Sequence, residues 1–114
     1  MWSRTSPEFR KDILLKFAEL LRVHGVENSV LECIDTGKLI GDCINEVAND
    51  APMHFQWYGE LIDKVFGKVG PTEPSLTSLI VKEPIGIVAG VVPWNFPLMT
   101  VSCTHLTLST IYSV

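Results

Sequence analysis

The chain has 114 residues, of which 46% are hydrophobic, and a formal net charge of -4 from 9 basic and 13 acidic side chains. This length allows a single domain with a modest core. The mild acidity argues against nucleic-acid binding, which requires a clustered basic surface. No group of His, Cys, Asp and Glu has the spacing of a metal site. We therefore expect neither a nucleic-acid partner nor a bound metal.

Cysteine usage and the amino-terminal residues indicate a reducing compartment. Cys33, Cys43 and Cys103 are too few for a disulfide framework, and no C-x-x-C pair occurs. The first ten residues contain no apolar stretch of the kind found in secretory signals. We therefore expect a cytoplasmic protein.

Residues 1–66 are predicted to form a layer of helices. Ser6-Pro7-Glu8 is a helix start, with serine as the N-cap and proline at the first helical position. Apolar residues then recur at helical spacing until Gly25, which is predicted to end the helix. These apolar residues are Ile13, Leu14, Phe17, Leu20 and Leu21.

Two further helical patterns complete this layer. The second ends at the sequence Asp35-Thr-Gly-Lys38, and its apolar positions are Val26, Val30, Leu31 and Ile34. The third extends from about residue 40 to residue 66. We expect Pro52 to kink or divide it, because proline cannot donate an intrahelical hydrogen bond. The predicted buried face of the third helix consists of Ile44, Val47, Ala51, Phe55, Tyr58, Ile62 and Val65.

Residues 67–83 are predicted to form a β-hairpin. Gly70-Pro71-Thr-Glu-Pro74 has the composition of a turn, and residues from Leu76 to Val81 are predicted to form a strand. The free edges of such a hairpin must find a partner, because unpaired backbone groups otherwise lead to aggregation.

The pattern in residues 84–114 predicts a strand followed by a helix. An apolar run rich in Ile and Val covers residues 84–92 and is typical of a strand buried on both faces of a parallel sheet. The strand is predicted to end at Pro93, which cannot donate to a β-ladder. Asn95 follows at the carboxyl end of the strand, where open α/β sheets bind ligands. Pro97 suits the first turn of a helix, so the predicted fold class is α/β.

This carboxyl-terminal segment also raises the question of a membrane span, because it contains no Asp, Glu, Lys or Arg. Gly86 and Gly90 form a G-x-x-x-G pair, a pattern of helix dimers in lipid. Pro93, Asn95 and Pro97 near the middle of the segment, and the Ser and Thr residues near its end, argue against a span of about 20 apolar residues. We therefore expect no membrane partner.

The same segment resembles a known family. Glu83-Pro-x-Gly86, followed by Pro93-Trp-Asn-Phe-Pro97, is similar to the motif that opens the cofactor domain of NAD(P)-dependent aldehyde dehydrogenases. The resemblance implies an incomplete aldehyde-dehydrogenase-like fold, here a single partial cofactor-binding domain over residues 1–114. Its parts would be the helical layer, a hairpin arm that pairs subunits in the family, and the first βα unit of a Rossmann-like cofactor domain.

Upstream sequences resemble the same family. Asp35-Thr-Gly-Lys38 and Phe55-x-x-Tyr58-Gly59 follow in the order that the family shows ahead of its cofactor strand, and they are similar to the gamma-glutamyl-gamma-aminobutyraldehyde dehydrogenase branch. The resemblance extends from Trp2 to Ser102. The residues from Cys103 to the end depart from the family pattern, as in a truncated, alternatively spliced or misassembled gene product.

The resemblance implies specific roles for the residues around Asn95. In the family, the side chain at this position donates to the oxyanion that forms when an aldehyde is attacked, and the preceding residues lie against NAD or NADP. Carried over, Asn95 is the oxyanion donor, and Val92, Pro93, Trp94 and Asn95 are the cofactor-binding residues, with a small aldehyde as the substrate. Two simpler interpretations stay open: Asn95 only caps the following helix, and Trp94 only packs.

The remaining requirements of aldehyde oxidation are not met by this sequence. Cys103 lies eight positions beyond Asn95, about 12 Å along a helix, so it cannot reach the same carbonyl. Glu83 is about 30 Å away along an extended strand and cannot act as the base. We therefore expect a fragment that is inactive alone. The alternative is a non-catalytic interaction protein that joins full-length aldehyde dehydrogenase subunits, as a homo- or hetero-oligomer through the hairpin arm.

Overall fold

The computed structural model describes residues 4–83, 86 and 89–108. Parts of the predicted strand (residues 84–85 and 87–88) and the end of the departing segment (residues 109–114) lie outside the described residues. In chain order the elements are α1 (Pro7–Val23), α2 (Gly25–Thr36), α3 (Ile40–Cys43), the π-helix η2 (Ile44–Asp50), α4 (Ala51–Leu61), the 3₁₀ turn η3 (Ile62–Lys64), β1 (Lys68–Gly70), β2 (Ser78–Ile80) and α5 (Pro97–Leu108).

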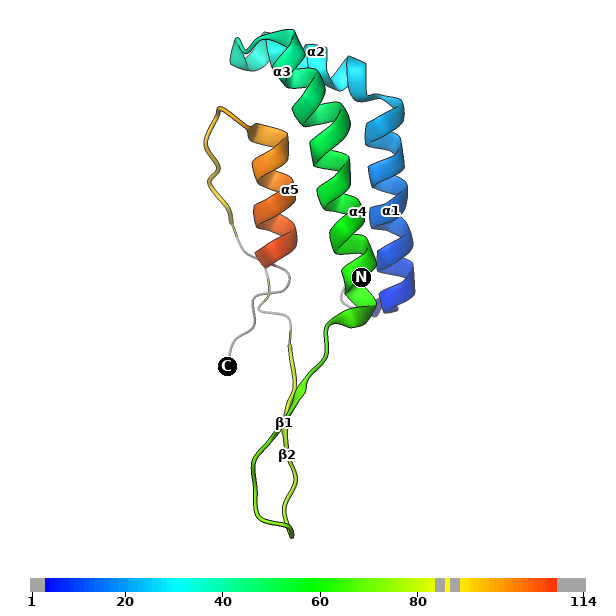
Figure 1. The fold of residues 1–114 in the computed structure, drawn as a ribbon, viewed down its shortest axis with the longest axis vertical. Helices are drawn as coiled ribbons and strands as arrows, with labels where there is room; N and C mark the ends of the chain where they lie inside the picture. Colours follow the sequence, from blue (N-terminus) through cyan, green and yellow to red (C-terminus); the bar gives the residue numbers. More distant parts are fainter. Residues whose placement is uncertain (1–3, 84–85, 87–88, 109–114) are drawn as a thin grey trace.

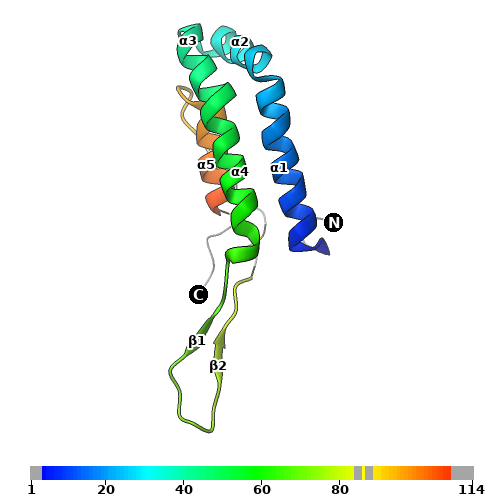
Figure 2. The same cartoon turned by 45° about the vertical axis from the view of Figure 1, so that its right-hand side comes forward.

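The helices form a layer with α4 in the middle, between α1 and α5 (Figure 1). Helices α2 and α3 close one end of this layer, and the hairpin β1–β2 projects from the other end (Figure 2). The molecule is therefore elongated, with extents of 62 × 26 × 24 Å. The start of α5 lies near α3, at the end of the molecule opposite the hairpin (Figure 1).

The predicted start of the first helix is confirmed. Ser6 is the N-cap of α1, and its Oγ accepts a hydrogen bond from the backbone N–H of Phe9 at 3.2 Å. Ala18 and Leu21 of this helix are buried together with Phe55 of α4. The ring of Phe17 packs edge-on against that of Phe55, with centroids 4.7 Å apart. This contact between α1 and α4 is the centre of the core.

The apolar positions of the second predicted helix do not form a buried face in the structure. Their side chains are 42–77% exposed, and they are Val26, Val30, Leu31 and Ile34. The buried residues of α2 are instead Gly25 and Ser29. A Cβ on Gly25 would lie 2.5 Å from the Cβ of Ala48, so small residues are what let α2 approach η2. The buried Ser29 hydroxyl is satisfied because it donates to the carbonyl of Gly25 at 2.6 Å.

The third helical pattern is divided at Pro52, as predicted. Proline occupies the first turn of α4, and the preceding turns widen into the π-helix η2, where the N–H of Ala51 donates to the carbonyl of Glu46. A proline there removes one donor and blocks the regular helical pairing upstream. Of the predicted face, Val47, Ala51 and Phe55 are buried, while the other members are only partly buried.

Gly37, which ends α2, has a positive φ of 73°. A side chain is strained in this left-handed conformation, so we expect Gly37→Ala to lower the free energy of unfolding by about 1 kcal/mol. Gly41→Ala is the matched control, because Gly41 lies in α3, has no positive φ, and a Cβ added there would meet nothing within 4 Å. Urea unfolding of both variants checks this, and equal stability of the two would contradict it.

An ion pair joins the ends of α1 and η3. The Nζ atoms of Lys11 and Lys64 lie 2.8 Å and 2.7 Å from the Asp63 carboxylate, and they lower its pKa from 3.8 to about 2. Because the folded-state pKa is the lower one, the stabilisation is present above pH 3.8 and is lost as the pH falls toward 2.

We therefore expect Asp63→Asn to lose most of its stability difference from the wild type as the pH falls through this window. Denaturant unfolding at a series of pH values, with Asp35→Asn as an exposed control, measures it. A stability difference that stays constant down to pH 2 would show that the ion pair does not contribute.

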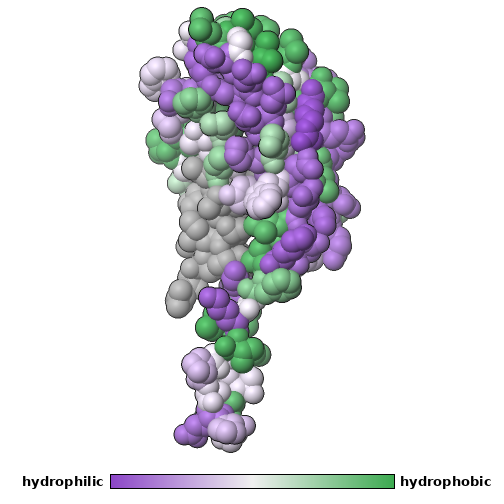
Figure 3. Space-filling model, viewed as in Figure 1, coloured by the Kyte–Doolittle hydropathy of each residue, from purple (hydrophilic) through white to green (hydrophobic). Residues whose placement is uncertain are grey.

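The hairpin is confirmed, with a β2 shorter than the predicted strand. β1 and β2 pair antiparallel, with Lys68 opposite Ile80 and Gly70 opposite Ser78. Apolar side chains on and beside the strands are 51–74% exposed; they are Phe66, Val69, Leu79, Ile80 and Val81. Hydrophobic residues also gather at the opposite end of the molecule, over α2 and α3 (Figure 3).

The buried strand predicted for residues 84–92 is wrong for the part of it that the structure describes. Gly86 and residues 89–92 are in no strand, and the side chain of Val91 is fully exposed. A strand inside a parallel sheet needs a neighbour on each side to take up its backbone N–H and C=O groups. Among the described residues the only sheet is the hairpin β1–β2, so this segment has no such neighbour.

Candidate functional site

The predicted site residues lie on the connection that leads into α5. Trp94 and Asn95 form a turn, and the N–H of Thr100 donates to the carbonyl of Phe96 at 2.8 Å where α5 begins. Asn95 and Pro93 are exposed, and Val92 is partly buried. Trp94 is 75% exposed, so packing within the described chain does not account for this side chain. The four predicted residues thus form one continuous and accessible stretch.

Charged side chains from three places in the helical layer support the start of α5. Lys38, just after the end of α2, forms an ion pair with Glu46 of η2, and its Nζ lies 3.7 Å from Oε1 of Glu32 on α2. The side chains of Glu32, Lys38 and Glu46 are only 8%, 15% and 13% exposed. We call these three residues the charged cluster. Lys38 Nζ also lies 4.4 Å from the centroid of the Phe96 ring.

Burial and pairing shift the pKa values within the charged cluster. Burial raises the pKa of the Glu32 carboxyl, and the Lys38 charge and the nearby Leu98 backbone N–H only partly offset this. Burial would lower the pKa of Lys38, but hydrogen bonding to Glu46 and the charges of Glu46 and Glu32 outweigh it, so the pKa of Lys38 is raised. Lys38 is therefore a cation held beneath the start of α5.

The charged cluster was not predicted from the sequence. Lys38 stood out only as part of a sequence that resembles the family. The burial of the cluster arises from packing among α2, η2 and the start of α5, which are distant in sequence. No local pattern reveals such a contact. A lysine directly after a helix-ending glycine, with glutamates nearby on two helices, is the one available signal.

Neither Cys103 nor Cys43 is suited to act as a nucleophile beside Asn95. Helix α5 forms from Pro97 onward, so Cys103 lies about 9 Å along its axis from the first helical residue. Cys43 is buried, and burial raises the pKa of its thiol, which disfavours the reactive thiolate. Glu83 lies exposed at the end of the hairpin segment. The described residues also contain no cluster of His, Cys, Asp and Glu that could hold a metal.

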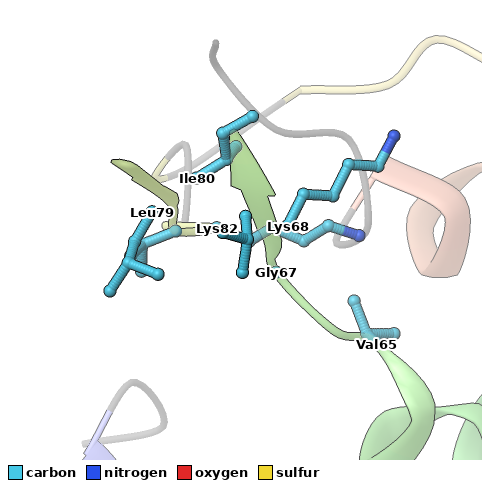
Figure 4. A pocket seen from close by; sticks show the side chains of 8 residues that line it. Val65, Gly67, Lys68, Leu79, Ile80 and Lys82 are labelled. Atoms are coloured by element: carbon cyan, nitrogen blue, oxygen red, sulfur yellow. The ribbon is translucent and has the colours of Figure 1, made fainter. Parts of the chain in front are cut away.

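A pocket lies at the base of the hairpin, away from the Asn95 turn. Its walls come from both strands and their flanks, and Lys68 and Lys82 lie at one side of it (Figure 4). The lining residues are Val65, Gly67, Lys68, Val69, Leu79, Ile80, Val81 and Lys82. No carboxylate, thiol or histidine is among these lining residues, and their charged side chains are those of Lys68 and Lys82. No helix among the described residues combines the length and apolar character that crossing a membrane requires.

Comparison with known proteins shows which family this chain resembles in sequence. The model of the aldehyde dehydrogenase family matches residues 1–108, and so extends past Ser102. The NADP/NAD-dependent aldehyde dehydrogenase PuuC of Escherichia coli is 44% identical over 98 residues, which are 86% of this chain and 20% of that protein. An aminoacetaldehyde dehydrogenase of Pseudomonas aeruginosa is 40% identical over the same length.

Solved structures agree with this. The gamma-glutamyl-gamma-aminobutyraldehyde dehydrogenase from Burkholderia cenocepacia superposes with a TM-score of 0.88 and 41% identity, over 100% of this chain and 23% of that one. An indole-3-acetaldehyde dehydrogenase of P. syringae, solved with NAD+, gives a TM-score of 0.86 and 37% identity, over 95% of this chain and 22% of that one. The chain thus spans about a fifth of the length of the curated relatives it matches. It belongs to the aldehyde dehydrogenase family and corresponds to the amino-terminal part of its members.

Proposed function

We propose that this chain supplies the oxyanion-binding turn and part of the cofactor surface of an NAD(P)-dependent aldehyde dehydrogenase. In this proposal Asn95 donates its side-chain N–H to the oxygen of the attacked aldehyde. Val92, Pro93 and Trp94, on the connection that leads into α5, lie against the dinucleotide. The observation that carries the proposal is the exposed Trp94–Asn95 turn directly ahead of α5, in a chain of this family.

The chemistry of aldehyde oxidation explains why such a turn is needed. A thiolate attacks the carbonyl, and the negative charge that forms on its oxygen must be stabilised by fixed donors. An amide on an accessible turn can reach that oxygen. The relative solved with NAD+ supports a dinucleotide as the hydride acceptor. We further propose that the nucleophile, the base and most of the cofactor site come from outside these 114 residues.

A hybrid enzyme tests the proposal. Residues 1–102 of this chain replace the matching segment of the Escherichia coli relative, and NADH formation is measured with NAD+ and a panel of aldehydes. We expect aldehyde-dependent turnover by the hybrid and none by the 114-residue chain alone. A folded hybrid without turnover would count against the proposed role of the segment. Robust turnover by the 114-residue chain alone would refute the proposal that the nucleophile and the base come from outside it.

The exposed hairpin supports a second function, which is association with full-length aldehyde dehydrogenase subunits. Its strands are short, have free edges and carry exposed apolar side chains. In this alternative the chain joins the subunits without taking part in catalysis. Co-purification with a full-length relative, lost when Leu79 and Val81 are both changed to Lys, would support it. Absence of binding at micromolar concentrations would exclude it.

A further inference from the structure

The burial of the charged cluster is explained neither by the hydrophobic core nor by the proposed chemistry. Two carboxylates and one ammonium group are taken out of water at the end of a helical layer that otherwise buries small and apolar residues. Such burial is unfavourable unless the groups make compensating contacts. Two contacts of these charged side chains are with the start of α5.

The first contact is to the backbone of α5. Leu98 is the second residue of this helix, and its backbone N–H, which has no partner within the helix, lies close enough to the Glu32 carboxyl to lower its pKa. A carboxylate near a helix N-terminus is also favoured by the helix dipole. Oε1 of Glu32 has no hydrogen-bond donor among the described residues, and Lys38 Nζ lies beyond hydrogen-bond distance at 3.7 Å. The Glu32 carboxylate thus lies at the N-terminus of α5, although it belongs to another helix.

The second contact is to the residue that follows Asn95. The Lys38 ammonium lies 4.4 Å from the centre of the Phe96 ring, within the distance at which a cation and an aromatic face attract each other. Lys38 is fixed in turn by Glu46. The backbone is therefore held at Phe96 and at Leu98, on both sides of Pro97. Little rotational freedom remains between these anchors, because proline also fixes its own φ.

We infer that Lys38 and Glu32 are positioning residues that hold the Asn95 turn against the helical layer. Lys38 fixes the Phe96 ring, Glu32 fixes the Leu98 amide, and Asn95 is the residue directly ahead of these anchors. The inference rests on the proposed function in one respect, which is the oxyanion-binding role that an ordered Asn95 would serve. The ordering itself can be measured on the 114-residue chain without turnover.

The test is a set of variants studied by NMR. In the wild type we expect a backbone order parameter of about 0.85 at Asn95, and in Lys38→Met a value below about 0.6. The Leu98 amide should exchange with solvent about tenfold faster in Lys38→Met. Lys38→Arg should restore both, because it keeps the cation over the ring. Lys64→Met is the matched control, since Lys64 is a lysine whose 57% exposed side chain pairs with Asp63 at the other end of the helices.

Lys38→Met also leaves two buried carboxylates unpaired, so this variant can unfold. Phe96→Leu then carries the test, because it removes the ring and leaves the ion pairs intact. The inference predicts a disordered Asn95 in Phe96→Leu, with helical circular dichroism unchanged. An ordered Asn95 in Phe96→Leu or in a folded Lys38→Met would overturn it. That result would leave the proposed function standing, whereas an inactive hybrid with an ordered Asn95 would refute only the function.

Discussion

Asn95→Ala in the hybrid enzyme is expected to lower kcat by about 10²- to 10³-fold, the usual effect of removing one oxyanion donor. The physical reason is that the donor acts where negative charge develops, so its loss is felt mainly in the transition state. The KM for NAD+ should change little, because Val92, Pro93 and Trp94 make most of the cofactor contacts that we propose for this segment. Steady-state kinetics with one aldehyde at varied NAD+ measures both quantities.

Matched variants separate the oxyanion role from a helix-capping role. Asn95→Asp keeps a side-chain acceptor that can cap α5 but removes the amide donor and adds a negative charge. If Asn95 only caps the helix, Asn95→Asp should retain activity and Asn95→Ala should lose only about 1 kcal/mol of stability. If Asn95 binds the oxyanion, both variants should lose activity, and a fully active Asn95→Asp hybrid would contradict the assignment.

Phe55→Ala is expected to have the largest effect on the fold of the chain. Phe55 is 8% exposed, belongs to the core cluster with Ala18 and Leu21, and its ring packs edge-on against Phe17. Truncating a buried phenylalanine costs about 3–5 kcal/mol. A small domain has about 5–15 kcal/mol in total. We therefore expect a fall in Tm of more than about 12 °C, at about 4–8 °C for each kcal/mol.

Met53→Ala on the same helix is the matched control for Phe55→Ala. Its side chain is 62% exposed, so its loss should change stability by less than about 0.5 kcal/mol. Thermal unfolding followed by circular dichroism compares the two. A Phe55→Ala variant as stable as Met53→Ala would show that the contact between α1 and α4 does not stabilise the chain.

The helix starts and ends were predictable because local chemistry decides them. Ser6 and Pro7 define the start of α1, Gly37 the end of α2 and Pro52 the division ahead of α4. Each of these acts through its own backbone or through a neighbour within one turn. The hairpin was predictable for the same reason, since its turn is marked by glycine and proline.

The buried faces were less predictable, because packing partners distant in sequence decide them. Helix α2 buries Gly25 and Ser29 and leaves its apolar positions exposed, since a close approach to Ala48 excludes larger side chains. The apolar run at residues 84–92 has the composition of a buried strand, but a strand also needs neighbours. The composition of a segment indicates the structure that it adopts when neighbouring strands are present. It does not show whether those strands are present.

The candidate site was predictable in part. Asn95 and Trp94 were identified from their place after an apolar run and from the resemblance to a family, and the structure describes them as an exposed turn. The charged cluster beneath that turn was not identified. Its three members, Glu32, Lys38 and Glu46, are separated in sequence and meet only because α2 and η2 pack together.

A crystal structure of the hybrid with NAD+ and a bound aldehyde adduct would test most directly whether Asn95 serves the reacting carbonyl. We predict that the Asn95 side-chain nitrogen lies about 2.7–3.1 Å from the oxygen of the adduct. We also predict that Val92 to Trp94 line the nicotinamide side of the cofactor. An Asn95 amide turned away from that oxygen, with another group in its place, would contradict the proposed role.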